Sequence, residues 1–186
     1  TLLNVLNGNL SLNHGEIRIN DYDIHRNKLA VQGLIGFVPQ DDLLIEELSV
    51  FQNLYYNAKL CFKDYSEIQI LKKVLHILQD LDLYEVRDLK VGDPLNKFIS
   101  GGQRKRINIG LELMREPAIL LVDEPTSGLS STDSEMVMNL LKSQTLKGKL
   151  VVANIHQPSS GIFKMFDKLW ILDRGGYPIY NGNPID

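Results

Sequence analysis

Three short apolar runs, with helical patterns between them, constrain the fold more than any other feature of the sequence. They cover 33–38, 118–122 and 150–155, and each is long enough for one strand but short for an ordinary helix. The intervening stretches 102–114 and 132–147 repeat their apolar residues at helical spacing. Strands that alternate with helices indicate an α/β domain with a mainly parallel sheet.

The interval between the first and second runs has a helical pattern throughout. Val50, Leu54 and Ala58 fall on one helical face, and Ser66 followed by Gln69 has the spacing of a capping box that begins a second helix. No strand pattern interrupts this interval. It therefore predicts a helical lobe inserted between two strands.

Three further local predictions concern the second half of the chain. Thr132 and Glu135 have the spacing of another capping box, at the start of the helix before the third run. Three consecutive cations, Arg104-Lys105-Arg106, are typical of the solvated face of a helix rather than of a nucleic-acid site. Trp170 lies among apolar strand residues and is predicted to be buried in the core.

Composition excludes several classes of protein. The 20 basic and 23 acidic residues give a net charge of −3, which argues against a nucleic-acid partner. No apolar run approaches the roughly 20 residues of a membrane-spanning helix, and the first residues lack the pattern of a targeting segment. The single cysteine, Cys61, forms no internal disulfide and is predicted to be a small buried apolar residue in a reducing compartment such as the cytoplasm.

Polar residues follow directly after the three apolar runs. Gln40 follows the first, Asp123 and Glu124 follow the second, and His156 follows the third. Because ligands of open parallel sheets bind beyond the carboxyl ends of the strands, these four residues are expected to face one site. Asp123 suits Mg²⁺, Glu124 has the chemistry of a general base, and His156 is a candidate donor to a phosphate. The alternative is that both carboxylates only cap the next turn.

A second candidate site precedes the helix at 102–114. In Ser100-Gly101-Gly102-Gln103 the two glycines allow a ligand close to the backbone, and the amides of the helix start favour an anion. The alternative is a serine N-cap with glycines in a loop.

In this order and spacing, these segments resemble the nucleotide-binding domain of an ABC transporter, and the resemblance covers essentially the whole chain. Three stretches are similar to the White, or G, subfamily: Arg104-Lys105-Arg106, 125–129 and 155–159. The matching motifs are the Q-loop at Gln40, the signature at Ser100, Gly101, Gly102 and Gln103, Walker B at Asp123 with the catalytic Glu124, the D-loop from Ser127, and the switch histidine His156.

The resemblance implies a RecA-like P-loop NTPase core formed by residues 1–45 and 106–186, with a helical lobe at 46–105. It implies two such domains that hold two ATP molecules head to tail, so that residues 100–103 contact the nucleotide of the partner domain. It also implies a transmembrane domain, on the same or another chain. The domain is then expected at the cytoplasmic face of a membrane.

By the same resemblance, each strand-end residue has a role in ATP hydrolysis. Asp123 and Gln40 are expected to hold Mg²⁺, Glu124 to polarise the attacking water, and His156 to contact the γ-phosphate.

Two features depart from the family pattern. Ser130 occupies the position where the D-loop usually has aspartate, which puts the usual contact of that residue across the dimer in doubt. The P-loop pattern G-x-x-x-x-G-K-[ST] does not occur in the printed sequence, and Thr1 resembles the position just after the P-loop lysine. The expectation is that Thr1 adjoins the nucleotide and that these 186 residues alone are not an active ATPase.

Two alternatives to a transporter remain at this point. One is a soluble ABC ATPase of repair, chromosome or translation type, although the 59 residues between Gln40 and Ser100 contain no sustained heptads. The other is a binding-only domain with degenerate catalysis, against which Glu124 and His156 argue.

Overall fold

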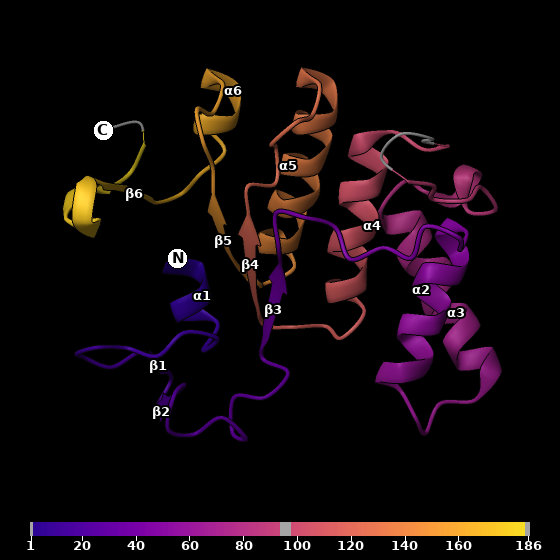
Figure 1. Cartoon of the computed structure of the whole chain (residues 1–186), viewed down its shortest axis with the longest axis horizontal. Helices are drawn as coiled ribbons and strands as arrows, with labels where there is room; N and C mark the ends of the chain where they lie inside the picture. The colour runs from indigo at the N-terminus through magenta and orange to yellow at the C-terminus, as the bar shows by residue number, and fades with distance from the viewer. Residues whose placement is uncertain (1, 94–97, 185–186) are drawn as a thin grey trace.

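The computed structural model describes residues 2–93 and 98–184. Its centre is a parallel sheet of β3 (Ile35–Val38), β4 (Ile119–Asp123) and β5 (Leu150–Asn154), in the order β3-β4-β5. The register pairs Val38 with Val122 and Asp123 with Asn154, so the three strands end at one edge (Figure 1). This arrangement confirms the predicted α/β fold class.

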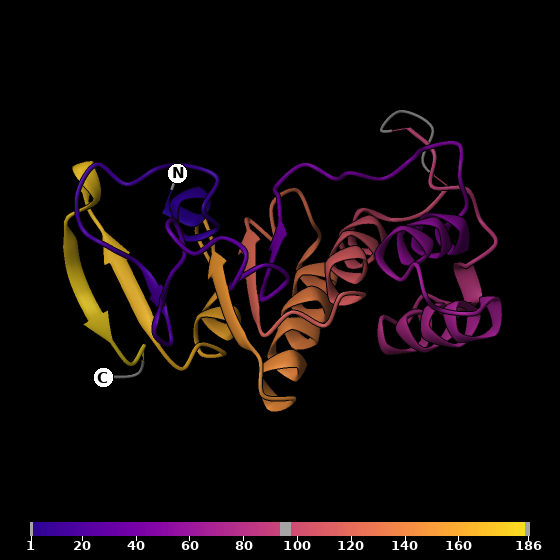
Figure 2. The ribbon, with the colours of Figure 1, turned by 90° about the horizontal axis from the view of Figure 1, so that it is seen from below.

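Helices cover both faces of this sheet. α4 (Gly101–Leu113) and α5 (Ser131–Leu146) pack together against one face, whereas α1 (Leu2–Leu6) contacts β4 from the other (Figure 2). The short α6 (Ser160–Phe163) follows β5. Figure 1 shows that α4 and α5 begin at the edge where the strands end. Loops and helix starts are therefore brought together at that edge.

Beyond α4 lie the helices of the predicted lobe, α2 (Val50–Cys61), α3 (Glu67–Asp80) and the 3-10 turn η1 (Tyr84–Val86). The predicted capping box of Ser66 and Gln69 begins α3. The domain boundary predicted between residues 105 and 106 falls inside α4, which is one continuous helix. None of the helices in the described ranges is long and apolar enough to cross a bilayer.

Two antiparallel pairs lie at the end of the molecule away from α2 and α3 (Figure 2). The first pair is β1 (Arg18–Ile19) with β2 (Tyr22–Asp23); the second is β6 (Leu169–Leu172) with β7 (Pro178–Gly182), joined through η2 (Arg174–Gly176).

Two predictions of burial were wrong. Trp170 is 56% exposed, because no layer covers the β6–β7 pair among the described residues, and its indole N–H donates to Asn181 Oδ1 at 2.6 Å. Cys61 is only partly buried at the end of α2, where its sulfur accepts a hydrogen bond from Arg115 Nε at 3.2 Å. An isolated pair and a helix end leave these apolar groups near water.

Candidate functional site

The ends of β3 and β4 bring two of the predicted residues into direct contact. Gln40 follows β3 after Pro39, and Glu124 is the first residue after β4. The Gln40 side-chain amide donates from Nε2 to Glu124 Oε2 at 3.0 Å. Residues that are 84 positions apart in the sequence are thus joined at the sheet edge, as the strand-end pattern predicts.

Asn154, at the end of β5, bonds the Asp123 carboxylate and the main chain of Glu124. Its side chain donates from Nδ2 to Asp123 Oδ1 at 2.9 Å, and its carbonyl accepts from the Glu124 N–H at 3.0 Å. Glu124 has φ of 44°, in the left-handed region, which costs a non-glycine residue about 1–3 kcal/mol. Asn154 was not predicted as a site residue, although it is the one polar residue within the apolar run 150–155 and pairs with Asp123 in the sheet.

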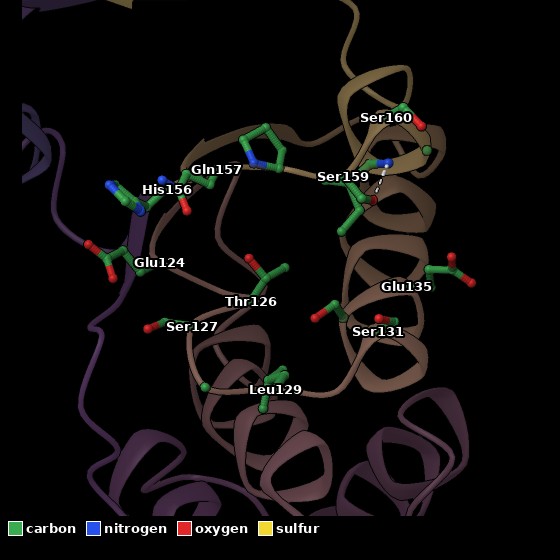
Figure 3. Close-up of a pocket in the computed structure, with 15 residues that line it drawn as sticks. Glu124, Thr126, Ser127, Leu129, Ser131, Glu135, His156, Gln157, Ser159 and Ser160 are labelled. Carbon is green, nitrogen blue, oxygen red and sulfur yellow. Dashed lines mark hydrogen bonds between the residues drawn. The ribbon is translucent and has the colours of Figure 1, made fainter.

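A cleft of about 970 Å³ opens between the loop after β4 and the loop after β5. Figure 3 shows Glu124 and His156 close together on one side of this cleft, with Ser131 and Glu135 of α5 on the other. Hydroxyl groups line much of the surface, from Thr126, Ser127, Ser131, Ser134, Ser159 and Ser160. The cleft therefore offers a carboxylate, an imidazole and many hydroxyl donors to a polar ligand.

The structure does not bring residues 100–103 into this cleft. Ser100 is the N-cap of α4 and forms a capping box with Gln103, so that each side chain bonds the backbone N–H of the other residue. Gly101 and Gly102 are the first residues of the helix rather than part of a loop. A Cβ at Gly102 would lie 2.2 Å from Asp133 Oδ1, which places this glycine against the start of α5.

The start of α5 corrects another prediction. The capping residue is Ser130, whose hydroxyl accepts from the Asp133 N–H at 3.1 Å, and not Thr132 paired with Glu135. The Ser130 hydroxyl also donates to Asp133 Oδ2 at 3.0 Å. Residue 130 therefore lacks a carboxylate of its own but holds the carboxylate of Asp133.

The three consecutive cations of α4 are buried, so the prediction of a solvated face was wrong. Arg104 pairs with Asp42 at 2.8 Å, Lys105 donates to the Pro39 and Gln40 carbonyls, and Arg106 donates to the Leu81 carbonyl at 2.9 Å. The physical reason is that α4 lies between the sheet and α2–α3, where this turn of the helix has no solvent face. The charged ends bind main-chain and carboxylate oxygens instead.

Burial lowers the pKa of the Lys105 ammonium, and the carboxylates of Asp123, Asp42, Asp41 and Glu124 act in the opposite direction. Lys105 is thus a buried cation beside the strand-end carboxylates. It belongs to the surroundings of Gln40 and Glu124, a place that its position in a run of three cations did not predict.

Oxygen donors at this edge have the chemistry that Mg²⁺ prefers, since a carboxylate and an amide carbonyl are hard ligands. Asp123 and Gln40 supply these groups. No cluster of three or more His, Cys, Asp or Glu side chains suited to a metal occurs within the described ranges. The donor set fits an ion that takes most of its ligands from phosphate oxygens and water.

A model of the ABC transporter family matches residues 1–127. ABC transporter G family member 28 of Arabidopsis thaliana is 42% identical over 150 residues, which are 80% of this chain and 14% of that protein. G family member 26 of the same plant is 39% identical over 98% of this chain and 26% of its own length. ABC-type transporter claG of Penicillium crustosum is 37% identical over 94% of this chain and 23% of its length.

An α/β domain with these strand-end residues is a nucleotide-binding domain of the P-loop NTPase class. The chain belongs to the ABC transporter family, and its relatives assign it to the G subfamily. It spans only about 14% to 26% of the length of the first curated relatives that it matches. Thr1, predicted to contact the nucleotide, lies outside the described residues.

Proposed function

We propose that this chain belongs to the ATP-hydrolysing part of a transporter that moves a substrate across a membrane. The observation that supports this most directly is the contact of Gln40 with Glu124, beside Asp123 at the edge of the parallel sheet. A carboxylate held at this edge by a side-chain amide is suited to accept a proton from water. The net charge of −3, and the lack of sustained heptads in the 59 residues between Gln40 and Ser100, argue against the other classes.

Each strand-end residue has one part in the proposed reaction. Glu124 accepts a proton from the water whose oxygen attacks the γ-phosphorus, and the bond from that phosphorus to ADP breaks. His156, on the same side of the cleft, donates to the γ-phosphate. Asp123 and Gln40 would hold Mg²⁺, which neutralises phosphate charge when bound. A positioned general base contributes about 10²–10⁴ in rate.

Residues 100–103 act on a second nucleotide in this proposal. They do not line the cleft that contains Glu124 and His156, and they surround the start of α4, where backbone amides favour an anion. A second nucleotide-binding domain, placed head to tail, would bring its ATP to Ser100, Gly101, Gly102 and Gln103. The core of 1–45 and 106–186, the lobe of 46–105, the transmembrane domain and the cytoplasmic face of the membrane remain parts of this proposal.

Glu124→Gln in the complete transporter tests the role of the base. Because the amide keeps the size of the side chain but accepts no proton, we expect ATP binding to persist and turnover to fall by about 10²-fold or more. Glu135→Gln is the matched control, since Glu135 belongs to α5 on the opposite side of the same cleft (Figure 3). Wild-type turnover of Glu124→Gln would contradict the proposal.

A further inference from the structure

Lys105 connects the helix that begins at the signature residues to the loop that carries Gln40. Its ammonium donates to the Pro39 carbonyl at 3.1 Å and to the Gln40 carbonyl at 3.0 Å, and the residue is only 8% exposed. Strand β3 ends at Val38, so these carbonyls have left the pairing of the sheet. Lys105 supplies donors that the neighbouring strand does not.

The same loop is attached to α4 by a second cation. Arg104 bonds both carboxylate oxygens of Asp42, at 2.8 and 3.1 Å. Residues 39–42 are therefore held at their main chain by Lys105 and at a side chain by Arg104. The hydrogen bonds therefore attach this loop to α4 at two residues of the helix.

Gln40 continues this connection to the proposed base. Its carbonyl accepts from Lys105, and its side chain donates to Glu124 Oε2 at 3.0 Å. One chain of hydrogen bonds thus runs from α4 through Gln40 to Glu124. Lys105, the first residue of this chain of hydrogen bonds, lies one helical turn after Gly101 and Gly102.

We propose that Lys105 is a positioning residue for Glu124 and acts through Gln40, so that the position of α4 controls how the Gln40 amide meets the base. This inference rests on the proposed role of Glu124 in ATP hydrolysis. A ligand that shifts the signature residues at the start of α4 would then alter Glu124 within the same chain. The start of α4, whose residues 100–103 do not line the cleft, would then be coupled to Glu124 inside it.

Lys105→Met in the complete transporter tests this inference. Methionine keeps an unbranched apolar stem but loses the donors, so the loop at Gln40 is free to shift. Since small misplacements of reacting groups reduce rates strongly, we expect kcat to fall about 10-fold to 100-fold with a smaller change in the KM for ATP. Lys105→Arg, which keeps a cation with several donors, is expected to recover part of kcat.

Arg106→Met is the matched control for lost stability. Arg106 is also a buried cation of α4, with 6% exposure, but it bonds the Leu81 carbonyl at the end of α3 instead of the loop at Gln40. Both methionine variants are expected to lower the melting temperature. Only Lys105→Met is expected to change kcat by more than about threefold.

A double-mutant cycle with Gln40→Ala decides whether Lys105 acts through Gln40. If it does, Lys105→Met added to Gln40→Ala changes kcat by less than about twofold. A further tenfold loss on the Gln40→Ala background, or wild-type kcat in Lys105→Met alone, would overturn the inference. If Lys105→Met does not fold, Lys105→Gln completes the same cycle, because its shorter polar side chain also removes the cation.

The role of Glu124 is tested separately in these experiments. Wild-type turnover in Glu124→Gln overturns the proposed function, whereas additive effects of Lys105→Met and Gln40→Ala overturn only the positioning role.

Discussion

Gly102 packs so closely against the start of α5 that alanine at this position is expected to destabilise the domain. A Cβ there would lie 2.2 Å from Oδ1, 2.5 Å from Cγ and 2.7 Å from Cβ of Asp133. The carboxylate end could rotate away, but the Asp133 Cβ moves only with the backbone of α5. Hydrogen bonds with Ser130 hold Asp133 in place. The absence of a side chain at 102 therefore has a cause inside the chain, apart from any approach of a nucleotide.

The size of the effect follows from comparison with the adjacent glycine. At Gly101 a Cβ would meet only Leu129 Cδ2, at 3.2 Å, which is the far end of a flexible side chain. Alanine gains up to about 1 kcal/mol of helix propensity over glycine at either position, whereas an extra methyl in a packed contact costs about 1–3 kcal/mol. Because both variants share the propensity gain, Gly102→Ala is expected to be about 1–3 kcal/mol less stable than Gly101→Ala.

Urea denaturation of the ATP-binding domain that contains this chain measures this difference as a free energy of unfolding. The two variants are expected to share one m-value, so that the midpoints report stability. Asp133→Ala should recover part of the loss in Gly102→Ala, because it removes the carboxylate but leaves the Cβ at 2.7 Å. Equal stability of Gly101→Ala and Gly102→Ala would refute the reasoning.

Two more substitutions test the packing around the site. Asn53→Ala removes three hydrogen bonds that hold residues 45–49, two of them to Ile45. It is expected to lower the free energy of unfolding by about 2–4 kcal/mol, measured by thermal unfolding. Asn57→Ala, on the same helix, is the control and should lower it less. Burial raises the pKa of Glu112, so the folded domain favours the protonated acid and loses stability as the pH rises through that pKa. Glu112→Gln, which can still accept from the Phe37 N–H, is therefore expected to raise the melting temperature at pH 7, and this gain should vanish below the unfolded-state pKa of glutamate. A constant gain at all pH values would contradict this explanation.

Local sequence patterns predicted the sheet and the contents of its edge. The run that ends at Val122 is apolar because β4 is the central strand and is covered by helices. The polar residues that follow it, Asp123 and Glu124, lie at the end of the strand, where the helices no longer cover it. The contact of Gln40 with Glu124 needed one further rule, that parallel strands end at the same edge.

Tertiary packing decided the features that the sequence analysis missed. The carbonyls bound by Lys105 and Arg106 lie 65 and 25 positions away in the sequence, so no local pattern distinguishes these cations from solvated ones. At the start of α5 the spacing of Thr132 and Glu135 predicted the cap two residues too late, and the structure has Ser130 as the N-cap.

Helix α4 contacts both the loop after β3 and the helices α2 and α3. Lys105 bonds the loop after β3, whereas Arg106, the next residue, bonds the end of α3. Further along the helix, a Cβ at Gly110 would lie 2.5 Å from Leu81 Cδ1, so the same helix is packed directly on the α2–α3 side. A continuous helix with such contacts on both sides moves as one body, since bending it within these turns would break its own hydrogen bonds. The proposed core and lobe therefore share α4, and the loop at Gln40, which Lys105 bonds to this helix, is the connection that leads to Glu124.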